Sequence, residues 1–424
     1  MSPPTAPALA QPATTAFPVE TLRRQFPAVI GAEPFAFFDN AAGAQLPQNV
    51  LDAVNRHLLD HNVQRGGRYA KSLEVDRMLA EARLKVAAFL NAYDPNEVCF
   101  GMNATSFMRM VGQALGQTLR PERSEIVVTD LDHDANIATW QALQAVGARI
   151  VWWRIREDGR LHVEDLLTLL SERTRLVACT VVSHALGSLV DVAAVARAAH
   201  AVGAEVFLDS VHYGPHAPID VQSWGCDYLV CSGYKIFGPH MGFLWGRFDK
   251  LAALPVARSE FIPDVAPHKF ETGTFIFENV AGMSAVVDYL AELGGTLSGG
   301  ATSTLRDRIV QGLDGIRSYE QVLSERMLVA LNEAGATIYG VGDPRLALQR
   351  VPTFCFNLAH MHPAEVVEKA AAVGLGIRDG HMYAPRLMER LGLSMDRGAV
   401  RASPVHYNTL AEVERFAEFL RSVA

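Results

Sequence analysis

Short apolar runs alternate with helix-forming segments through the stretch 97–210 of the chain. The runs are rich in β-branched and aromatic residues and end at polar ones, as buried parallel strands do at the edge of a sheet. Apolar side chains at helical spacing separate them, for example over Val163–Ser171 and Val192–Val202. This alternation predicts a mostly parallel sheet with ligands bound at the carboxyl ends of its strands.

Two of these strand ends carry an acid and an amine. The run Val206–Leu208 ends at Asp209, and a second run around Val230 leads to Lys235. A carboxylate and an amine at neighbouring strand ends suit pyridoxal phosphate, because the amine can form a Schiff base and the carboxylate can keep the pyridine nitrogen protonated. Lys235 alone would equally fit a surface lysine in a strand–turn–strand unit, so the cofactor role depends on the partners described below.

The order and spacing of these residues resemble the class V aminotransferases, especially the branch that holds cysteine desulfurases, selenocysteine lyase and isopenicillin N epimerase. Ser232-Gly233-Tyr234-Lys235 parallels the family's Ser-Gly-His-Lys block, and Asp209 precedes it at the family's spacing. The resemblance covers nearly the whole chain. It implies pyridoxal 5′-phosphate on Lys235, a catalytic Asp209, and cofactor contacts from Ser232 and Tyr234.

The resemblance also implies the architecture. We expect an α/β fold of the pyridoxal phosphate-dependent transferase fold-type I, with a mostly parallel seven-stranded sheet in a large domain and a small α/β C-terminal domain. The expected boundaries are a disordered tail over 1–18, an N-terminal segment over 19–33 that packs with the small domain, the large domain over 34–285 and the small domain over 286–424. The family further implies a homodimer with shared active sites.

A phosphate site is predicted where the strand Glu97–Phe100 gives way to a helix. Backbone N–H groups and the positive end of the helix dipole would face an anion held at Ala104 and Thr105. The family has Gly-Thr-Thr-Glu here, whereas this chain reads Met102-Asn103-Ala104-Thr105. Helix capping alone would also account for the polar residues of this turn.

Three histidines are expected around the cofactor ring. The segment from His133 to Asn136 resembles the family's His-His-Ala-Asn, which implies that His133 stacks on the ring and takes part in catalysis. His184 stands where an asparagine of the family contacts the cofactor's phenolic oxygen, and His212 stands where the desulfurases place glutamine against the same oxygen. Either histidine can donate a hydrogen bond. The spacing His212-x-x-x-His216 also resembles a metal site, but the segment contains Pro215 and is not helical, so no metal is expected.

The remaining site residues are implied by the resemblance alone. Arg401 matches the arginine that grips the substrate α-carboxylate, a task that suits a planar guanidinium. The other expected substrate contacts are Ala42 in a turn of small residues, Arg68, Arg378 and Tyr383. Arg68 stands in a glycine-rich loop that, in the family, reaches into the neighbouring subunit's site. Thr274 matches a threonine that reaches the partner's cofactor phosphate across the dimer interface. A solvated surface arginine is an equally ordinary interpretation of Arg68.

Tyr383 departs from the family. The desulfurases read Arg-x-Gly-x-x-Cys-Ala where this chain has Arg378 to Ala384, and their cysteine receives the sulfur; this chain has Tyr383 at that position. We therefore predict a cysteine desulfurase-like lyase that acts on a small amino acid, by C–S or related β-elimination, without a persulfide cysteine. An epimerase or racemase, an aminotransferase of the same family, and a catalytically silent cofactor-binding protein are the alternatives.

The composition of the chain limits the classes of molecule that it is expected to bind. A formal net charge of −8, with no run of Lys or Arg, argues against nucleic acid and anionic membranes as partners. Apolar runs stay shorter than the ~18 residues of a membrane helix. The five cysteines lie singly in apolar runs without C-x-x-C spacing, which favours buried, reduced thiols and a cytoplasmic location.

Overall fold

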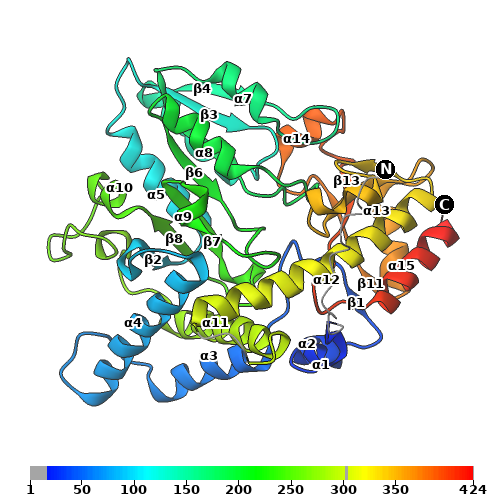
Figure 1. Cartoon of the computed structure of the whole chain (residues 1–424), viewed down its shortest axis with the longest axis horizontal. Coiled ribbons are helices and arrows are strands. Elements are labelled where there is room, and N and C mark those ends of the chain that lie inside the picture. The colour runs from blue at the N-terminus through cyan, green and yellow to red at the C-terminus, as the bar shows by residue number, and fades with distance from the viewer. Residues whose placement is uncertain (1–16, 301–303, 424) are drawn as a thin grey trace, which may run out of the picture.

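The computed structural model describes residues 17–300 and 304–423, and within them a seven-stranded sheet forms the centre of the larger lobe (Figure 1). The sheet order is β2-β8-β7-β6-β5-β3-β4, with β8 antiparallel to both neighbours and the other pairs parallel. Its strands are β2 (Val98–Gly101), β3 (Glu125–Thr129), β4 (Arg149–Trp153), β5 (Thr174–Thr180), β6 (Glu205–Asp209), β7 (Tyr228–Ser232) and β8 (Gly242–Gly246). The predicted mostly parallel seven-stranded sheet is confirmed. The predicted tail lies outside the described residues up to residue 16.

Helices cover both faces of this sheet. Successive side chains of a strand point to opposite faces, so strands that are apolar throughout need a covering layer on each side. In β6, Val206 and Leu208 join one core cluster with residues of α4 (Ala70–Leu90), α8 (Val192–Ala201) and α11 (Phe277–Leu297). Phe207 points the other way, and its ring packs 5.1 Å from that of Trp140 in α6 (Ala135–Gln141). Because both faces of β6 are covered, a ligand can reach this strand only at its carboxyl end.

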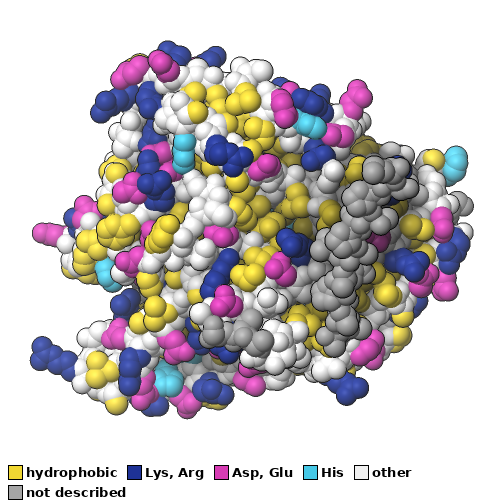
Figure 2. All heavy atoms as spheres, viewed as in Figure 1, with side chains coloured by type: hydrophobic (Ala, Val, Ile, Leu, Met, Phe, Trp, Pro, Cys, Tyr) yellow, Lys and Arg dark blue, Asp and Glu magenta, His cyan; other side chains and the backbone are white. Residues whose placement is uncertain are grey.

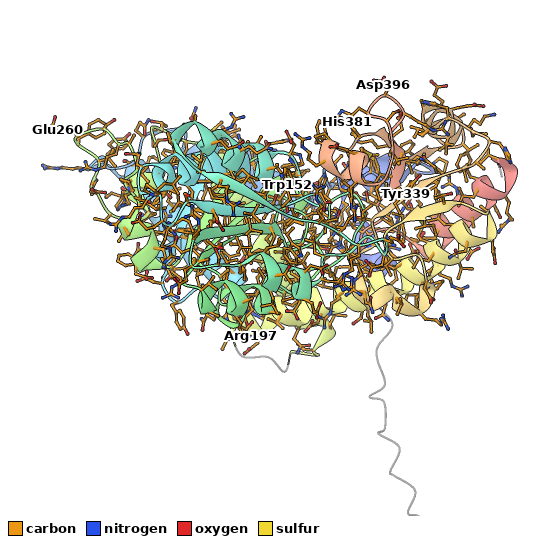
Figure 3. The ribbon with its side chains drawn as sticks, turned by 90° about the horizontal axis from the view of Figure 1, so that it is seen from above. Trp152, Arg197, Glu260, Tyr339, His381 and Asp396 are labelled. Carbon is orange, nitrogen blue, oxygen red and sulfur yellow. The ribbon has the colours of Figure 1, made fainter. Side chains whose placement is uncertain are left out.

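The smaller lobe is built on an antiparallel sheet of order β12-β13-β10-β9. Its strands are β9 (Thr337–Tyr339), β10 (Phe354–Asn357), β12 (Arg378–Gly380) and β13 (Ala399–Ala402), and its core includes residues of α12 (Leu305–Glu333), α13 (Pro363–Ala372) and α15 (Leu410–Val423). A separate parallel pair joins β1 (Ala36–Phe37) to β11 (Leu375–Gly376). Figure 3 labels Tyr339, His381 and Asp396 on this lobe and Trp152 and Glu260 on the larger one.

The remaining helices connect and cover these sheets. They are α1 (Val19–Arg23), α2 (Pro27–Gly31), α3 (Gln48–Asp60), α5 (Ala104–Gly116), α7 (Val163–Leu169), α9 (Val221–Trp224), α10 (Phe248–Ala253) and α14 (Pro385–Arg390). No helix of the described residues combines the length and the apolar character that a membrane span requires. On the face drawn in Figure 2, basic and acidic side chains lie interspersed.

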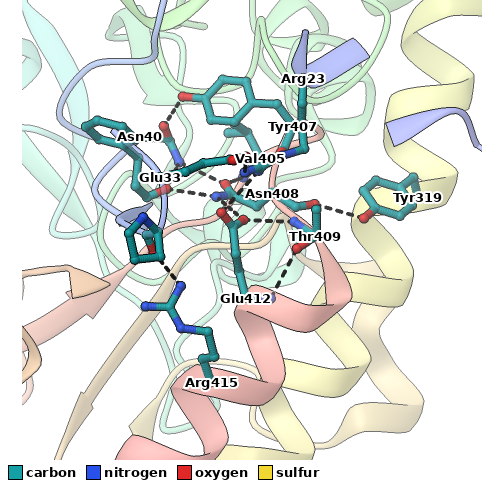
Figure 4. Close-up of polar contacts among 12 residues, drawn as sticks. Arg23, Glu33, Asn40, Tyr319, Val405, Tyr407, Asn408, Thr409, Glu412 and Arg415 are labelled. Carbon is teal, nitrogen blue, oxygen red and sulfur yellow. Dashed lines mark hydrogen bonds and ion pairs between the residues drawn. The ribbon is translucent and has the colours of Figure 1, made fainter. Parts of the chain in front are cut away.

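A buried polar network ties the start of the chain to its end (Figure 4). Arg23 of α1 donates to the backbone oxygen of Tyr407 at 2.7 Å and to Glu412 of α15 at 3.1 Å. The side-chain amide of Asn40 donates to the oxygen of Ser403 at 2.8 Å and lies 3.2 Å from Asn408 Oδ1. These contacts hold α1 and the segment around Asn40 against the C-terminal part of the chain. The expected N-terminal segment and the boundaries at residues 33 and 285 stay predictions.

Candidate active site

A pocket opens at the carboxyl ends of β5, β6 and β7 and at the N-terminus of α5. Its lining consists of Ala104, Thr105, Met108, His133, Ala135, Thr180, His184, Asp209, Val211, His212, Ser232, Tyr234 and Lys235. Among the residues predicted to bind the cofactor, Thr274 alone is missing from this lining. The fold therefore brings together side chains from five separate parts of the sequence, as the strand-end argument requires.

Lys235 enters the pocket from a short turn, Gly233–Lys235, that directly follows β7. The side chain is buried, and its amine makes no hydrogen bond to any described residue. Burial lowers the pKa of Lys235 to about 8, with the charge of Arg401 acting in the same direction and that of Asp209 opposing it. A buried amine that loses its proton this readily is a nucleophile at mildly basic pH.

Asp209 is the last residue of β6 and is 6% exposed. Its Oδ1 accepts a hydrogen bond from the backbone N–H of Val211 at 2.9 Å. Burial raises the pKa of Asp209, while this hydrogen bond and the charge of Lys235 act in the opposite direction. A cationic nitrogen beside the carboxylate would favour its ionised form further. The arrangement fits the pyridinium nitrogen of pyridoxal phosphate.

The N-terminus of α5 forms the opposite end of the pocket. Asn103 caps the helix, because its Oδ1 accepts from the backbone N–H of Ser106 at 2.8 Å. Asn103 and Ser106 are thus occupied with each other, and the backbone N–H groups of Ala104 and Thr105 remain for an anion. A Cβ on Gly242 of β8 would lie 2.3 Å from the carbonyl carbon of Asn103. Only glycine lets α5 start this close to the sheet.

His133 lies between the pocket and the segment that covers it. Its Nδ1 accepts from the backbone N–H of Ala135 at 3.1 Å, so Nε2 carries the proton of the neutral ring. Burial lowers the pKa of His133 to about 4, with Lys235 and Arg401 adding to the effect. The ring lies 5.0 Å from that of His184. A neutral imidazole at this place suits stacking on a cofactor ring, which stays a prediction.

His184 and His212 both line the pocket, but their hydrogen bonds restrict what they can donate. Nε2 of His184 lies 2.7 Å from the backbone oxygen of Met382, and a carbonyl only accepts, so Nε2 is the protonated nitrogen. Burial lowers the pKa of His184, and the neutral ring then has only an acceptor left at Nδ1. The expected donation from His184 to the phenolic oxygen is therefore not available to the neutral side chain. Nε2 of His212 lies 2.9 Å from Thr353 Oγ1, and its Nδ1 has no partner among the described residues.

Arg401 and Arg378 meet at one carboxylate that the sequence reasoning did not single out. Asp39 accepts from Arg378 Nε at 2.9 Å and from Arg401 Nη2 at 3.1 Å. Arg401 is 3% exposed and also donates to the oxygen of His184, while its Nε has no partner in the described part of the chain. A buried guanidinium with one unpaired N–H is prepared to bind a further anion, such as a substrate carboxylate. The sequence signal that could have pointed to Asp39 is its position directly after the apolar run Phe35–Phe38.

Tyr383 lies over the pocket mouth rather than in its lining. Its ring stacks on that of His133 with centroids 5.8 Å apart, and its side chain is 60% exposed. The backbone oxygen of Tyr383 accepts from the N–H of Asp134 at 2.9 Å, and φ is positive at both Met382 and Tyr383. Together with the His184–Met382 hydrogen bond, these contacts fasten the segment from Arg378 to Ala384 onto the larger lobe.

Six predicted site residues are absent from the lining of this pocket, namely Arg378, Tyr383 and Arg401, described above, and Ala42, Arg68 and Thr274. Ala42 occupies the turn after Asp39 and is half-buried. Arg68 and Thr274 are exposed, and Thr274 Oγ1 accepts from Gln64 Nε2 at 2.7 Å. Since Arg68 and Thr274 were expected to act on a neighbouring subunit, their exposure in a single chain neither adds them to the pocket nor removes them.

A buried network beneath His133 was also missed. Asp132 is fully buried and accepts from Asn136 Nδ2 at 2.7 Å, and Trp140 donates to Asn136 Oδ1 at 2.9 Å. Burial raises the pKa of Asp132 to about 8, against the hydrogen bonds from Thr129 and Asn136. The network fixes the turn that carries His133. Its sequence signal was the spacing of Asp132, Asn136 and Trp140, four residues apart on one side of a helix.

The fold and the pocket define a pyridoxal phosphate-dependent enzyme, since a buried amine, a buried carboxylate and a free helix N-terminus each fit one part of that cofactor. The family model described as Aminotransferase class-V matches residues 36–416, and the chain belongs to that family. Members of this family use pyridoxal 5′-phosphate.

Curated relatives extend over the whole chain. A probable cysteine desulfurase of Streptomyces coelicolor is 33% identical, over 95% of this chain and 96% of its own length. An aminotransferase-like protein of Gibberella zeae is 34% identical, over 97% of this chain and 99% of its own. Among solved structures, the cysteine desulfurase of Thermococcus onnurineus in its apo form matches with a TM-score of 0.85 at 26% identity, covering 97% of this chain and 99% of the other.

Proposed function

We propose that this protein is a lyase that removes a leaving group from Cβ of a small amino acid and that it does so without a persulfide-carrying cysteine. The observation that carries the proposal is Tyr383, which lies at the pocket mouth where the resembling desulfurases have their cysteine. All five cysteines, Cys99, Cys179, Cys226, Cys231 and Cys355, are buried. Burial raises the pKa of each thiol, which keeps it protonated and unreactive.

The side chains of the pocket divide the work. Lys235 would hold the cofactor's aldehyde carbon and, once released by substrate, would remove the Cα proton. Asp209 would pair with the pyridine nitrogen, and the start of α5 would bind the phosphate. When bound, pyridoxal phosphate supplies the electron sink that stabilises negative charge at Cα. Arg401, through its unpaired Nε, would bind the substrate carboxylate.

Product analysis of the purified protein across an amino-acid panel tests the proposal. We expect pyruvate or its homologue, ammonia and a released leaving group without any added keto acid. Cysteine should release its sulfur directly as sulfide. Cyanolysis after incubation with cysteine should yield no thiocyanate from the protein, and thiocyanate stoichiometric with active sites that disappears on mutation of one cysteine would refute the proposal.

Transamination is the second candidate, and the aminotransferase-like relative from Gibberella zeae favours it. The two reactions separate cleanly, because transamination needs a keto-acid acceptor and conserves the amino group, whereas elimination needs none and frees ammonia. Inversion of configuration at Cα, measured on a chiral column, would instead identify an epimerase.

We also infer a homodimer with shared sites. Arg68 and Thr274 are exposed in one chain and lie on neighbouring loops joined by the Gln64–Thr274 hydrogen bond. Because family resemblance gives both residues a role in the partner's pocket, a second copy of the chain would complete each site.

A further inference from the structure

A row of buried titratable side chains lies behind the cofactor pocket, between the turn that follows β6 and helix α12. The row consists of His212, His216 and Glu320, each no more than 4% exposed. The rings of His212 and His216 lie 5.1 Å apart, and His216 Nδ1 lies 2.7 Å from Glu320 Oε2. The row is therefore continuous from the cofactor pocket, which His212 lines, to the middle of α12.

The far end of the row opens into a second cavity. His216 and Glu320 line this cavity together with side chains of α12 and of the loop that follows the short helix Pro344–Gln349. Its lining also includes Tyr213, Arg317, Gln321, Ser324 and Arg350. One three-residue row thus separates two cavities.

Polar atoms along the row are buried and unpaired. In the described part of the chain, His212 Nδ1, His216 Nε2, Glu320 Oε1 and Ser324 Oγ have no hydrogen-bond partner. An unpaired buried polar atom costs about 1–3 kcal/mol, and proteins avoid this cost by binding ordered water. The described residues contain no group of three or more His, Cys, Asp or Glu arranged to hold a metal ion. Water is therefore the occupant that these atoms require.

We propose that His212, His216, Glu320 and the water molecules they bind form a proton passage between the cofactor pocket and the cavity beside α12. An imidazole accepts a proton on one nitrogen and releases one from the other, and a carboxylate accepts and releases a proton on its oxygens. Each transfer leaves the imidazole in its other tautomer, and the ring regains the starting tautomer when it rotates or when a proton passes back. One proton enters from solvent water in the cavity for each proton delivered to the pocket, and no electrons move. The other titratable and charged groups that face the row are Lys235, Arg401 and His184 beside His212. His406 and Tyr319 lie beside His216 and Glu320, and Tyr213, Arg317 and Arg350 line the second cavity.

The inference rests on the proposed function, because an elimination must supply a proton to its leaving group while the pocket is covered. The Arg378–Ala384 segment lies over the front of the pocket and is held there by the His184–Met382 and Asp134–Tyr383 hydrogen bonds. The 2.7 Å contact between His216 Nδ1 and Glu320 Oε2 is a hydrogen bond, so one proton lies between the two atoms. Burial raises the pKa of Glu320, with His216 acting in the opposite direction. A rear passage lets protons move while the front stays covered.

Hydrogen exchange at the substrate Cα in heavy water tests the passage, since exchange follows Cα deprotonation whatever the later product. Glu320→Gln and His212→Gln keep the size and polarity of each side chain but remove its ability to relay a proton. We expect exchange about tenfold slower in both variants, within the range that general acid–base groups contribute. Added imidazole should restore the rate in Glu320→Gln. Gln321→Ala lines the same cavity outside the row and should exchange like the native protein.

A crystal structure of the cofactor-loaded protein gives a readout independent of turnover, and it should show ordered water bonded to His216 Nε2 and Glu320 Oε1. Native exchange with equally fast exchange in both variants, or a dry row in the crystal, would overturn the passage and leave the proposed function intact. No exchange in the native protein would instead overturn the proposed function together with the passage.

Discussion

Single residues of the pocket owe their chemistry to burial more than to their identity. Lys235 has its pKa lowered and Asp209 has its pKa raised by the same desolvation. The sequence predicted both residues because each follows a strand. It could not predict that Asp39 would join Arg378 and Arg401, since Asp39 and Arg378 are 339 positions apart and no local pattern connects them. For the same reason the sequence could not predict the hydrogen bond from His184 Nε2 to the backbone oxygen of Met382, which occupies the donor expected for the phenolic oxygen.

The pKa of Lys235 predicts how the apoprotein captures its cofactor. Only the neutral amine attacks an aldehyde, so the capture rate should rise with pH through a midpoint near 8 and level off above it. Stopped-flow absorbance of apoprotein mixed with pyridoxal phosphate measures this rate. A midpoint near 10.5, the ordinary value for lysine, would show that burial does not lower the pKa.

Desolvation of the same amine also predicts a stability change. The unfolded chain holds the Lys235 proton up to its ordinary pKa of about 10.4, whereas the folded apoprotein releases it near 8. Because the unfolded state binds more protons in this window, folding should become more stable as pH rises from 8 to 10. Urea denaturation of apoprotein at several pH values checks this, and Lys235→Met should flatten the slope.

Arg401→Lys should weaken substrate binding and leave the cofactor in place. Lysine keeps the positive charge but loses the planar fork, and a charged hydrogen bond is worth about 1.5–3 kcal/mol. We expect KM to rise about 10- to 100-fold with an unchanged cofactor absorbance spectrum, measured by steady-state kinetics and titration. Arg397→Lys, at an exposed position on the same lobe, serves as the control. An unchanged KM would remove Arg401 from the substrate site.

At the scale of elements, patterning predicted the large sheet closely and missed one long helix that leads into the smaller lobe. The strand expected over Glu97–Phe100 is β2 (Val98–Gly101), one residue further along the chain, because a buried strand shows as an unbroken apolar run. Helix α12 was not predicted, although Thr304 and Asp307 form a capping box and Ile309, Leu313 and Ile316 mark its buried side. The many charged side chains on its exposed face make the helical spacing of these apolar residues hard to recognise in the sequence.

The approach of α5 to β8 is tested by Gly242→Ala. The new methyl group would overlap the backbone at Asn103 and Ala104 and push the helix start away from the sheet. We expect a loss of about 1–3 kcal/mol in stability and weaker binding of both pyridoxal phosphate and inorganic phosphate. Thermal unfolding and equilibrium dialysis give the two numbers. Gly295→Ala, in helix α11, is the matched control, because its methyl group would meet only Arg308 Cδ at 3.9 Å. It should raise stability by up to about 1 kcal/mol and leave the binding of both ligands unchanged.

The whole molecule divides into two lobes that each contribute one half of the site. The larger lobe carries the residues expected to surround the cofactor, and Arg401 and Arg378 come from the antiparallel sheet of the smaller lobe. Fold class and the order of the pocket residues were predictable from the resemblance. The contacts between lobes were not, because they depend on how two separately patterned sheets meet.

Shared sites predict that two inactive chains can complement each other. Lys235→Ala removes the amine of its own pocket, whereas Thr274→Ala removes a group offered to the partner's pocket. Mixed dimers should contain one site with neither change and regain part of the native activity, measured after co-refolding. A mixture of Lys235→Ala with Asp209→Ala should stay inactive. Each of these changes disables the pocket of the chain that carries it, so neither pocket of a mixed dimer is intact. A fully active monomer would contradict the dimer proposal.

The pairing of β1 with β11 has a consequence for synthesis on the ribosome. The large sheet is complete once Gly246 has emerged, so Asp209, Lys235 and the start of α5 can assemble early in translation. Asp39 and β1 must wait for Arg378 and β11, which leave the ribosome near the end. In a nascent chain, the residues expected to bind the cofactor would thus assemble before those expected to bind the substrate. Strand β1, although it is made first, would be among the last elements to pair.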